Sequence, residues 1–370
     1  MDALKAVKHY LKNTDLYLMF LALICSAYGM VLIYSATRGS GSMRYVGIQF
    51  IATMIGLAAF VIMSLIDLEA MSNWWKIFVV LNVILQLTLI PFGTEANGQR
   101  SWINFGPMSL QPAELGKLLF IFTFAANLSE IREHINEWRG IIILALHTLI
   151  LMGAIVLSSK DTGMAIQYFM IALVMMFAAG LSFKWLGLGL GLGVASIPIL
   201  WNFVMEDYQK NRILVLFDPS IDPDTAMQTT RGMTAIGAGQ FSGQGLTNGA
   251  MTQMGLVPES RTDLIFSVAG EELGFIGSML IVALLFLLIL RLFYVSFRGS
   301  TGFSSLMAVG IAGMFMFQTF MNLFMVLGLL PVMGLTLPFF SYGGTSVMTM
   351  YAALGIAAGV RMREKPSWLQ

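Results

Sequence analysis

The sequence contains few of the residues on which metal sites, disulfides and nucleic-acid interfaces depend. Only 11% of its 370 residues are charged, and it has three histidines and one cysteine. His9, His134 and His147 are scattered along the chain and form no recognisable metal constellation. Cys25 has no second cysteine with which to form an internal disulfide. A formal net charge of +1 gives no basic surface for phosphate, so we expect no nucleic-acid partner.

The sequence is instead rich in apolar residues. They make up 57% of the chain, and the mean hydropathy is +0.78. A bilayer core needs roughly 20 apolar residues per helix. We therefore predict an all-α, polytopic membrane protein with about ten transmembrane helices, built as a single membrane domain over residues 1–370. The apolar runs are 16–37, 46–66, 77–92, 112–128, 140–158, 163–182, 185–205, 264–290, 304–329 and 344–360.

The distribution of basic residues predicts the orientation. An even number of spans places both chain ends on one side, and cytoplasmic loops carry the excess of Lys and Arg. With the N-terminus inside, the cytoplasmic pieces contain Lys5, Lys8, Lys12, Lys76, Arg132, Arg139, Lys184, Arg291, Arg298, Arg361, Arg363 and Lys365. The short outer loops contain only Arg38, Arg44, Arg100 and Lys160. The long segment 206–262 is then extracytoplasmic, and chemistry there has no access to cytosolic ATP.

Glycine-rich stretches have a structural interpretation. Gly187–Gly193 and Ala308–Gly313 have the small-residue spacing that lets membrane helices approach closely, so we predict both to be packing sites. Gly237–Gly245 lacks the lysine and the strand context of a phosphate-binding loop, and we expect no nucleotide. No fixed-period repeat is evident, which disfavours a transporter built from repeated halves.

Asp263 stands where a polar loop turns into a strongly apolar helix. One interpretation is a helix N-cap, held by free backbone amides. The other is a general base whose pKa is raised beside a hydrocarbon wall and which removes a proton from an acceptor hydroxyl. Both roles are compatible at this stage.

Carboxylates within apolar segments are costly and are functional candidates by default. Glu271 and Glu272 lie two turns beyond Asp263, and one of them could pair with a cation. Glu114 and Lys117 are three residues apart on one predicted helix that starts at Pro112. They form either a neutralising ion pair or the polar floor of a substrate cavity.

Several outer loops carry further candidates. Arg100 adjoins Trp102, and its guanidinium could bind a pyrophosphate-linked lipid or a lipid headgroup. Lys160 and Asp161 suggest a loop salt bridge, and Arg212 adds a cation to the long outer segment. The Pro- and Gly-rich loop around Ser341 dips into the last helix, where irregular backbone must be buried in protein or line a cavity.

In their order, these pieces resemble the SEDS family, which comprises the RodA, FtsW and SpoVE polymerases. The resemblance covers nearly the whole chain. Its anchors are Gly98-Gln99-Arg100 with Trp102, Gln111-Pro112-Ala113-Glu114 with Lys117, Asp207-Tyr208-Gln209 with Arg212, Asp218-Pro219, Ala235-Ile236-Gly237, Gly243-Gln244-Gly245, Pro258-Glu259, Thr262-Asp263, Glu271-Glu272-Leu273-Gly274 and Leu337-Pro338-Phe339-Phe340-Ser341-Tyr342-Gly343-Gly344. The chain departs from the family pattern at Lys160–Gly163, Leu264, Gln240 and Ala113, which weakens a role for Lys160 and Asp161.

The resemblance implies a peptidoglycan glycosyltransferase of the bacterial cytoplasmic membrane. Such an enzyme polymerises lipid II on the outer face and releases undecaprenyl pyrophosphate, and Asp263 matches the family's essential aspartate. A divalent cation, Mg²⁺ or Mn²⁺, would suit the leaving pyrophosphate, although its ligands cannot be identified from the sequence. The expected partners are a class B penicillin-binding protein and the elongation machinery. Substrate contacts are expected from Arg100, Glu114, Lys117, Arg212, Glu271 and Ser341.

Three alternatives stay open at this point. A lipid II flippase would use the same embedded charges to line a translocation path. A noncatalytic scaffold would position a transpeptidase and use Asp263 only structurally.

The short N-terminal tail, the Tyr208–Gln209 pair and the lack of the FtsW-type Ser-x-Gln-Lys stretch after Gly245 are more like RodA, the elongation enzyme. A division or sporulation role is the third alternative.

Overall fold

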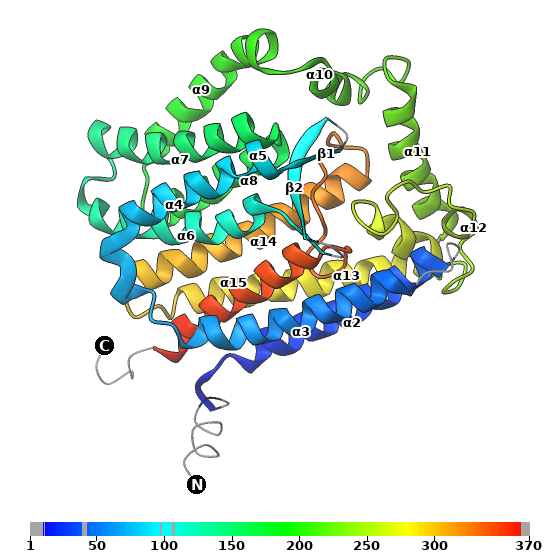
Figure 1. Cartoon of the computed structure of the whole chain (residues 1–370), viewed down its shortest axis with the longest axis horizontal. Helices are drawn as coiled ribbons and strands as arrows, with labels where there is room; N and C mark the ends of the chain where they lie inside the picture. Colours follow the sequence, from blue (N-terminus) through cyan, green and yellow to red (C-terminus); the bar gives the residue numbers. More distant parts are fainter. Residues whose placement is uncertain (1–9, 11, 39–42, 97, 106–107, 364–370) are drawn as a thin grey trace.

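The computed structural model is built almost entirely of helices (Figure 1). It describes residues 10, 12–38, 43–96, 98–105 and 108–363. The long helices are α2 (Leu16–Arg38), α3 (Arg44–Leu65), α4 (Trp75–Leu87), α6 (Pro112–Glu130), α7 (Trp138–Ser159), α8 (Thr162–Ala178), α9 (Phe183–Ile199), α13 (Ile265–Ser296), α14 (Gly302–Val326) and α15 (Gly344–Met362). The remaining elements are the 3-10 turns η1 (Glu69–Trp74) and η2 (Arg132–His134), the π-helical η3 (Leu200–Val204), α5 (Leu89–Phe92), α10 (Asp207–Leu214), α11 (Pro223–Ala238), α12 (Ala250–Gln253), β1 (Thr94–Ala96), β2 (Gln99–Phe105) and β3 (Met108–Leu110).

The long helices occupy the predicted apolar runs. Within the described residues, seven are long and apolar enough to cross a membrane, with Glu69–Phe92 taken as one span. The other three, α6, α8 and α15, are shorter or less apolar and lie among them (Figure 1). α6 and α15 bury most of their residues, so neighbouring helices replace lipid around them. The prediction of an all-α polytopic membrane protein is confirmed.

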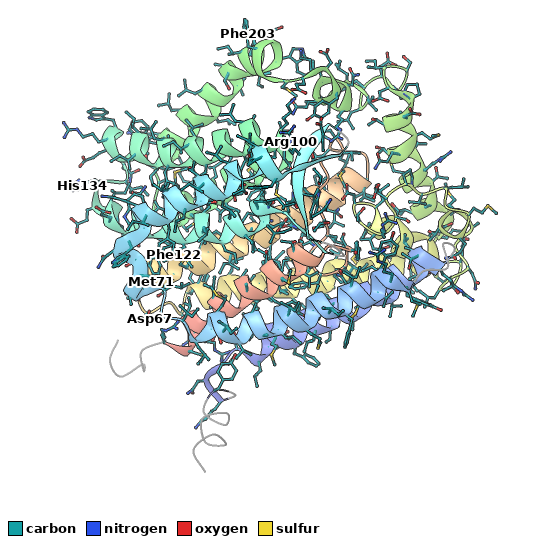
Figure 2. All side chains as sticks on the ribbon, in the orientation of Figure 1. Asp67, Met71, Arg100, Phe122, His134 and Phe203 are labelled. Carbon is teal, nitrogen blue, oxygen red and sulfur yellow. The ribbon has the colours of Figure 1, made fainter. Side chains whose placement is uncertain are left out.

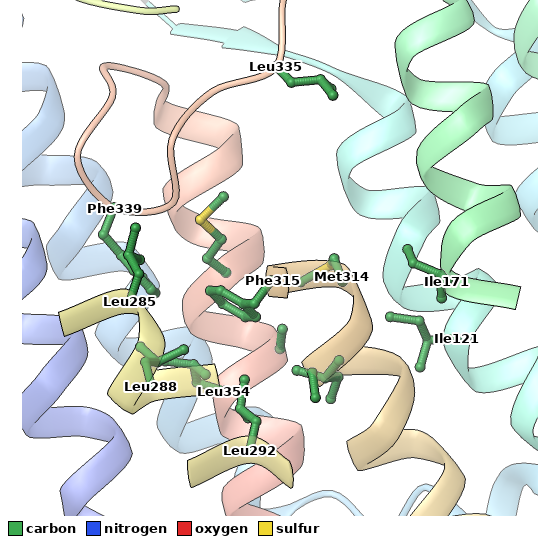
Figure 3. Close-up of a cluster of buried hydrophobic side chains, with 14 of the residues drawn as sticks. Ile121, Ile171, Leu285, Leu288, Leu292, Met314, Phe315, Leu335, Phe339 and Leu354 are labelled. Carbon is green, nitrogen blue, oxygen red and sulfur yellow. The ribbon is translucent and has the colours of Figure 1, made fainter. Parts of the chain in front are cut away.

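The core is a close-packed cluster at the crossing of several helices. Figure 3 shows side chains from α13 (Leu285, Leu288, Leu292), α14 (Phe315) and α15 (Leu354) packed together. Lipid is as apolar as these side chains, so association depends on dispersion contacts and close backbone approach rather than on escape from water.

Glycine permits the closest of these approaches. A Cβ at Gly355 on α15 would lie 2.8 Å from the Cα of Phe60 on α3. In the predicted packing site Ala308–Gly313, a Cβ at Gly313 would lie 3.2 Å from Val174, and this prediction is confirmed.

The prediction for Gly187–Gly193 is wrong. A Cβ added at any glycine of this stretch would meet no atom within 4 Å. No residue of α9 is buried, and α9 lies at the periphery of the bundle (Figure 1). These glycines therefore provide no close helix approach in this structure.

The two ends of the described chain meet at one end of the bundle. The carboxylate of Asp15 is fully buried and forms ion pairs with Arg291 on α13 and Arg361 on α15, at 2.9 and 3.0 Å. Thr14 also contacts Met362. This agrees with an even number of spans. The predicted positions Lys5, Lys8 and Lys365 lie outside the described residues.

The segment 206–262 lies at the opposite end and folds onto α13. It contains α10, α11 and α12. α13 is broken at Gly274, which has φ 65° and ψ −159°, and residues 240–245 bond to its backbone on both sides of the break. The amides of Gln244 and Gly245 donate to the carbonyls of Glu271 and Glu272, and the amide of Phe275 donates to the carbonyl of Gln240. The backbone groups freed by the kink are thus satisfied by the loop.

The buried carboxylates of α13 also help to attach the segment 206–262 to this helix. Glu271 accepts from the backbone amides of Met251 and Thr252, at the start of α12. Glu272 accepts from Ser35 and Gln253. The suggestion that one of these glutamates pairs with a cation is wrong for the part of the chain that the structure describes, because hydroxyl and amide groups hold both.

One element was not predicted. Residues 94–96, 99–105 and 108–110 form a three-stranded antiparallel sheet in the order β1-β2-β3, where the sequence predicts a short loop. Its strands are too short and too polar to give a strong alternating pattern.

We expect Gly355→Leu to destabilise the bundle and Gly189→Leu to be tolerated. The first side chain would collide with the α3 backbone, at a cost of about 1–3 kcal/mol, while the second meets open space. Unfolding temperatures of the purified proteins in detergent measure the difference. Equal melting of the two variants would contradict the packing described for α3 and α15.

Candidate active site

A cavity of about 590 Å³ opens at the end of the bundle opposite the chain ends. This volume is in the range of small-molecule sites, roughly 300–1,000 Å³. Its walls come from the sheet (Ser101, Trp102), α6 (Glu114), α10 (Arg212), the turn before α13 (Asp263) and the loop before α15, and Asp161 at the start of α8 also lines it. Segments far apart in the sequence therefore meet around one polar space.

Asp263 presents an unengaged carboxylate to this cavity. The N-cap of α13 is Leu264, without a side-chain hydrogen bond, so the interpretation of Asp263 as the helix cap is wrong. Among the described residues, no hydrogen bond or ion pair engages the two carboxylate oxygens of Asp263. Loss of water raises its pKa to about 7, with Glu259 and Asp161 adding to the rise and Arg212 opposing it. A carboxyl group titrating near neutral pH is suited to proton abstraction.

The backbone of the turn that carries Asp263 is firmly held. Three consecutive carbonyls accept hydrogen bonds from different donors. The amide of Tyr342 donates to Arg261 (2.8 Å), the hydroxyl of Ser341 to Thr262 (2.7 Å) and the side-chain amide of Asn322 to Asp263 (3.0 Å). Ser341, predicted to contact substrate, thus fixes the turn and is absent from the cavity lining among the described residues.

The predicted pair on α6 lies at the cavity floor. The ammonium of Lys117 is 2.8 Å from the carboxylate of Glu114, and both side chains are buried. Glu114 lines the cavity, while Lys117 lies behind it and donates to Gln167 and Gln318. The ion-pair interpretation is confirmed, and the acidic member of the pair lines the cavity. A role of this pair in substrate binding stays a prediction.

The two predicted arginines differ in position. Arg212 lines the cavity, stacks on Tyr208 and donates to the carbonyl of Val332. Arg100 donates to the carbonyl of Ile90 and lies 3.9 Å from Glu95. In Figure 2, Arg100 is distant from Asp67 and His134, which mark the end where the chain ends meet. Within the described residues, Arg212 is the one cation in the lining, so it is the stronger candidate for a phosphate contact.

Asp161 lines the cavity, although the departure of Lys160–Gly163 from the family pattern weakens a role for it. Its carboxylate caps α8 by accepting from the amide of Met164, and it also accepts from the hydroxyl of Ser101 in β2. Burial raises its pKa. The predicted salt bridge to Lys160 is wrong, because Lys160 pairs with Glu206 at 2.6 Å. The sheet, tied to α8 through Ser101, brings Trp102 to the cavity wall.

Nothing in the described residues forms a preassembled metal centre. They include no group of three or more His, Cys, Asp or Glu side chains arranged to hold an ion. A cation bound by the protein alone does not fit these side chains.

Comparison with known proteins decides the family. The FtsW/RodA/SpoVE family, described as "Cell cycle protein", matches residues 15–366. The chain belongs to this family. The peptidoglycan glycosyltransferase MrdB of Escherichia coli K12 is 32% identical over 95% of this chain and 94% of its own length. The probable peptidoglycan glycosyltransferase FtsW of Geobacter metallireducens is 34% identical over 98% and 97%.

Solved structures of family members have the same fold. A chain from a study of polymerization and crosslinking by a peptidoglycan synthase complex superposes with a TM-score of 0.81 at 29% identity, covering 96% of this chain and 99% of that one. The rod shape determining protein RodA of Thermus thermophilus superposes with a TM-score of 0.71 at 27% identity, covering 96% and 98%. The fold expected from the family resemblance is therefore confirmed.

We expect Lys117→Met to destabilise this family member strongly. The substitution leaves the Glu114 carboxylate buried without its cation, at a cost of about 3–5 kcal/mol. The double variant Lys117→Met with Glu114→Gln removes both charges and should recover much of that loss. Thermal unfolding measures both variants.

The control is the pair of Lys210, which is half-buried, and Asp207, which is exposed; their charged groups are 3.6 Å apart. Lys210→Gln should change the unfolding temperature little. A double variant no more stable than Lys117→Met alone would contradict the ion-pair account.

Proposed function

We propose that this protein polymerises lipid II into glycan strands during cell elongation, as a peptidoglycan glycosyltransferase of the bacterial cytoplasmic membrane. The single observation that carries the proposal is the Asp263 carboxylate, which is unengaged, lines the open cavity and shares the cavity wall with Arg212. Family membership supports the same activity, because relatives covering almost the whole chain are named peptidoglycan glycosyltransferases.

The proposed reaction is an inverting transfer. Asp263 accepts the proton of the acceptor sugar's 4-hydroxyl while that oxygen attacks the anomeric carbon of the donor. A new carbon–oxygen glycosidic bond forms, and the bond between the anomeric carbon and the pyrophosphate oxygen breaks. The electron pair leaves with undecaprenyl pyrophosphate, and the proton stays on Asp263 until water removes it.

Charge on the departing pyrophosphate needs compensation. Arg212 is the cavity-lining cation available among the described residues, and its planar guanidinium suits phosphate oxygens. Arg100 and Lys117 lie outside that lining, which leaves Arg212 first among the predicted phosphate contacts. A divalent cation that binds with the substrate phosphates, rather than at a protein-only site, is part of the proposal. No nucleotide takes part.

The proposed location has both chain ends in the cytoplasm and the cavity on the outer face. Two features support it: the chain ends and the cavity lie at opposite ends of the bundle, and basic residues concentrate on the side of the chain ends. The proposed partner is a class B penicillin-binding protein that crosslinks the new strand within the elongation machinery. A related chain studied in a synthase complex that coordinates polymerization and crosslinking supports such an association.

The elongation role rests on the RodA-like sequence features, since relatives of similar identity include both MrdB and FtsW. Complementation separates the roles. The gene should restore rod shape to cells depleted of their elongation glycosyltransferase and should fail to restore division to cells depleted of the division enzyme.

Replacing Asp263 by Asn should abolish polymerisation. The amide keeps the size of the side chain but accepts a proton poorly, so we expect glycan formation to fall by about 100-fold or more. The measurement is strand formation from purified lipid II by wild type and variant, with the transpeptidase partner and Mg²⁺ or Mn²⁺. Folding is compared by thermal unfolding.

Three outcomes separate the candidate functions. An inactive, well-folded Asp263→Asn beside an active wild type supports the base assignment. Equal activity of the two would move the base elsewhere. An inactive wild type under every partner and metal condition would favour the flippase or the scaffold.

The rate should depend on pH through Asp263. Only the ionised carboxylate accepts a proton, so the rate should fall by about tenfold per pH unit below about 7. Glu259→Gln removes a neighbouring negative charge that raises this pKa, and the acidic limb should therefore move to lower pH. A limb that stays in place in Glu259→Gln would show that another group controls it.

A further inference from the structure

Two side-chain amides on α14 lie directly behind the turn that carries Asp263. Asn322 and Gln318 are four residues apart, and both are almost completely buried. Neither lines the cavity within the described part of the chain. Polar side chains inside an apolar helix are costly unless each is paired, so their partners indicate their role.

Asn322 joins two segments that come from different parts of the sequence. Its side-chain nitrogen donates to the carbonyl of Asp263 at 3.0 Å and to the carbonyl of Leu335 at 2.7 Å. Both of its N–H groups are therefore used. Its side-chain oxygen has no partner among the described residues. The residue keeps an unsatisfied acceptor while it holds two carbonyls at once.

Gln318 makes the corresponding connection one helical turn away. Its nitrogen donates to the carbonyl and the hydroxyl of Thr336, at 3.0 and 3.2 Å. Its oxygen accepts from Lys117 at 3.0 Å and from Gln167 at 2.9 Å. Thr336 lines the cavity. Gln318 thus connects the buried charge of α6 to the cavity wall next to the segment that Asn322 holds.

We propose that Asn322 and Gln318 are positioning residues for glycosyl transfer, which fix the turn of Asp263 against the loop Leu335–Thr336 without touching substrate. The inference rests on the proposed function, in which Asp263 is the base. The Asp263 carboxylate has no side-chain partner of its own in the described residues, so its direction depends on its backbone. A displacement of about 1 Å in a reacting group can cost about 100-fold in rate.

The test compares variants of three buried amides, Asn322, Gln318 and Asn127, in steady-state polymerisation of lipid II. Asn322→Leu removes both donors, and Asn322→Asp removes them with no change in shape. Asn127→Leu is the matched control, because Asn127 is a buried amide that contacts His147 and does not line the cavity among the described residues.

For the Asn322 variants we expect kcat to fall by about 10- to 100-fold and KM to stay within about twofold of wild type, since the residue lies outside the substrate lining. In Asn322→Leu, which adds no charge, the acidic limb of the pH profile should also shift downward, because a loosened turn admits water to Asp263 and lowers its pKa. Asn127→Leu should lower the unfolding temperature without changing the pH profile. Gln318→Glu keeps the acceptor for Lys117 and loses the donors to Thr336, so kcat should fall in the same direction.

A purely structural role gives a different result. If Asn322→Asp and Gln318→Glu, folded as well as Asn127→Leu, keep the wild-type kcat and pH profile, the inference is overturned while the proposed function stands. If KM rises and kcat is unchanged, the residues affect binding and the inference is also overturned. A wild type that makes no glycan overturns the proposed function and the inference together.

Discussion

The site depends on the hydrogen bonds that join the turn before α13 to the loop before α15. The carbonyls of Arg261, Thr262 and Asp263 all point to donors from α14 or from residues 341–342. In an apolar bundle a carbonyl without a hydrogen-bond donor costs folding free energy. Each of these bonds therefore strongly favours one arrangement of the two segments that it joins. The surrounding helices, with their glycine-mediated contacts, keep those segments in register. The position of the candidate base is thus a consequence of backbone satisfaction and not of contacts to its own carboxylate.

Much of the fold could be predicted from the sequence because lipid imposes a simple rule. Each membrane helix must be a long apolar run, and the ten predicted runs coincide with the long helices. The failures have physical reasons as well. The sheet at 94–110 is short and polar, so its strands give no periodic signal. The glycines of α9 have a packing spacing, but spacing carries no information on whether a neighbouring helix is present.

The candidate site was predictable in its residue types and less so in its pairings. Asp263, Glu114 and Arg212 were selected from the sequence and meet around one cavity. Glu271 was selected by the same rule for buried carboxylates, yet it caps α12. A rule for buried charges does not select Asn322 and Gln318, although a neutral amide in an apolar helix is also a costly group. Partners distant in sequence, such as Ser101 and Asp161, could be found only in three dimensions.

The broken helix α13 has a consequence for biogenesis. Residues 240–245, which satisfy the backbone around Gly274, precede α13 in the chain. Synthesis proceeds from the N-terminus, so the complementary strip is already made when this helix enters the membrane. In the proposed orientation the strip must also have crossed the membrane, because it binds the end of α13 that lies opposite the chain ends. In that orientation, translocation of the segment 206–262 is a prerequisite for the final shape of α13, and a block in its export would leave the backbone around Gly274 without its hydrogen-bond partners.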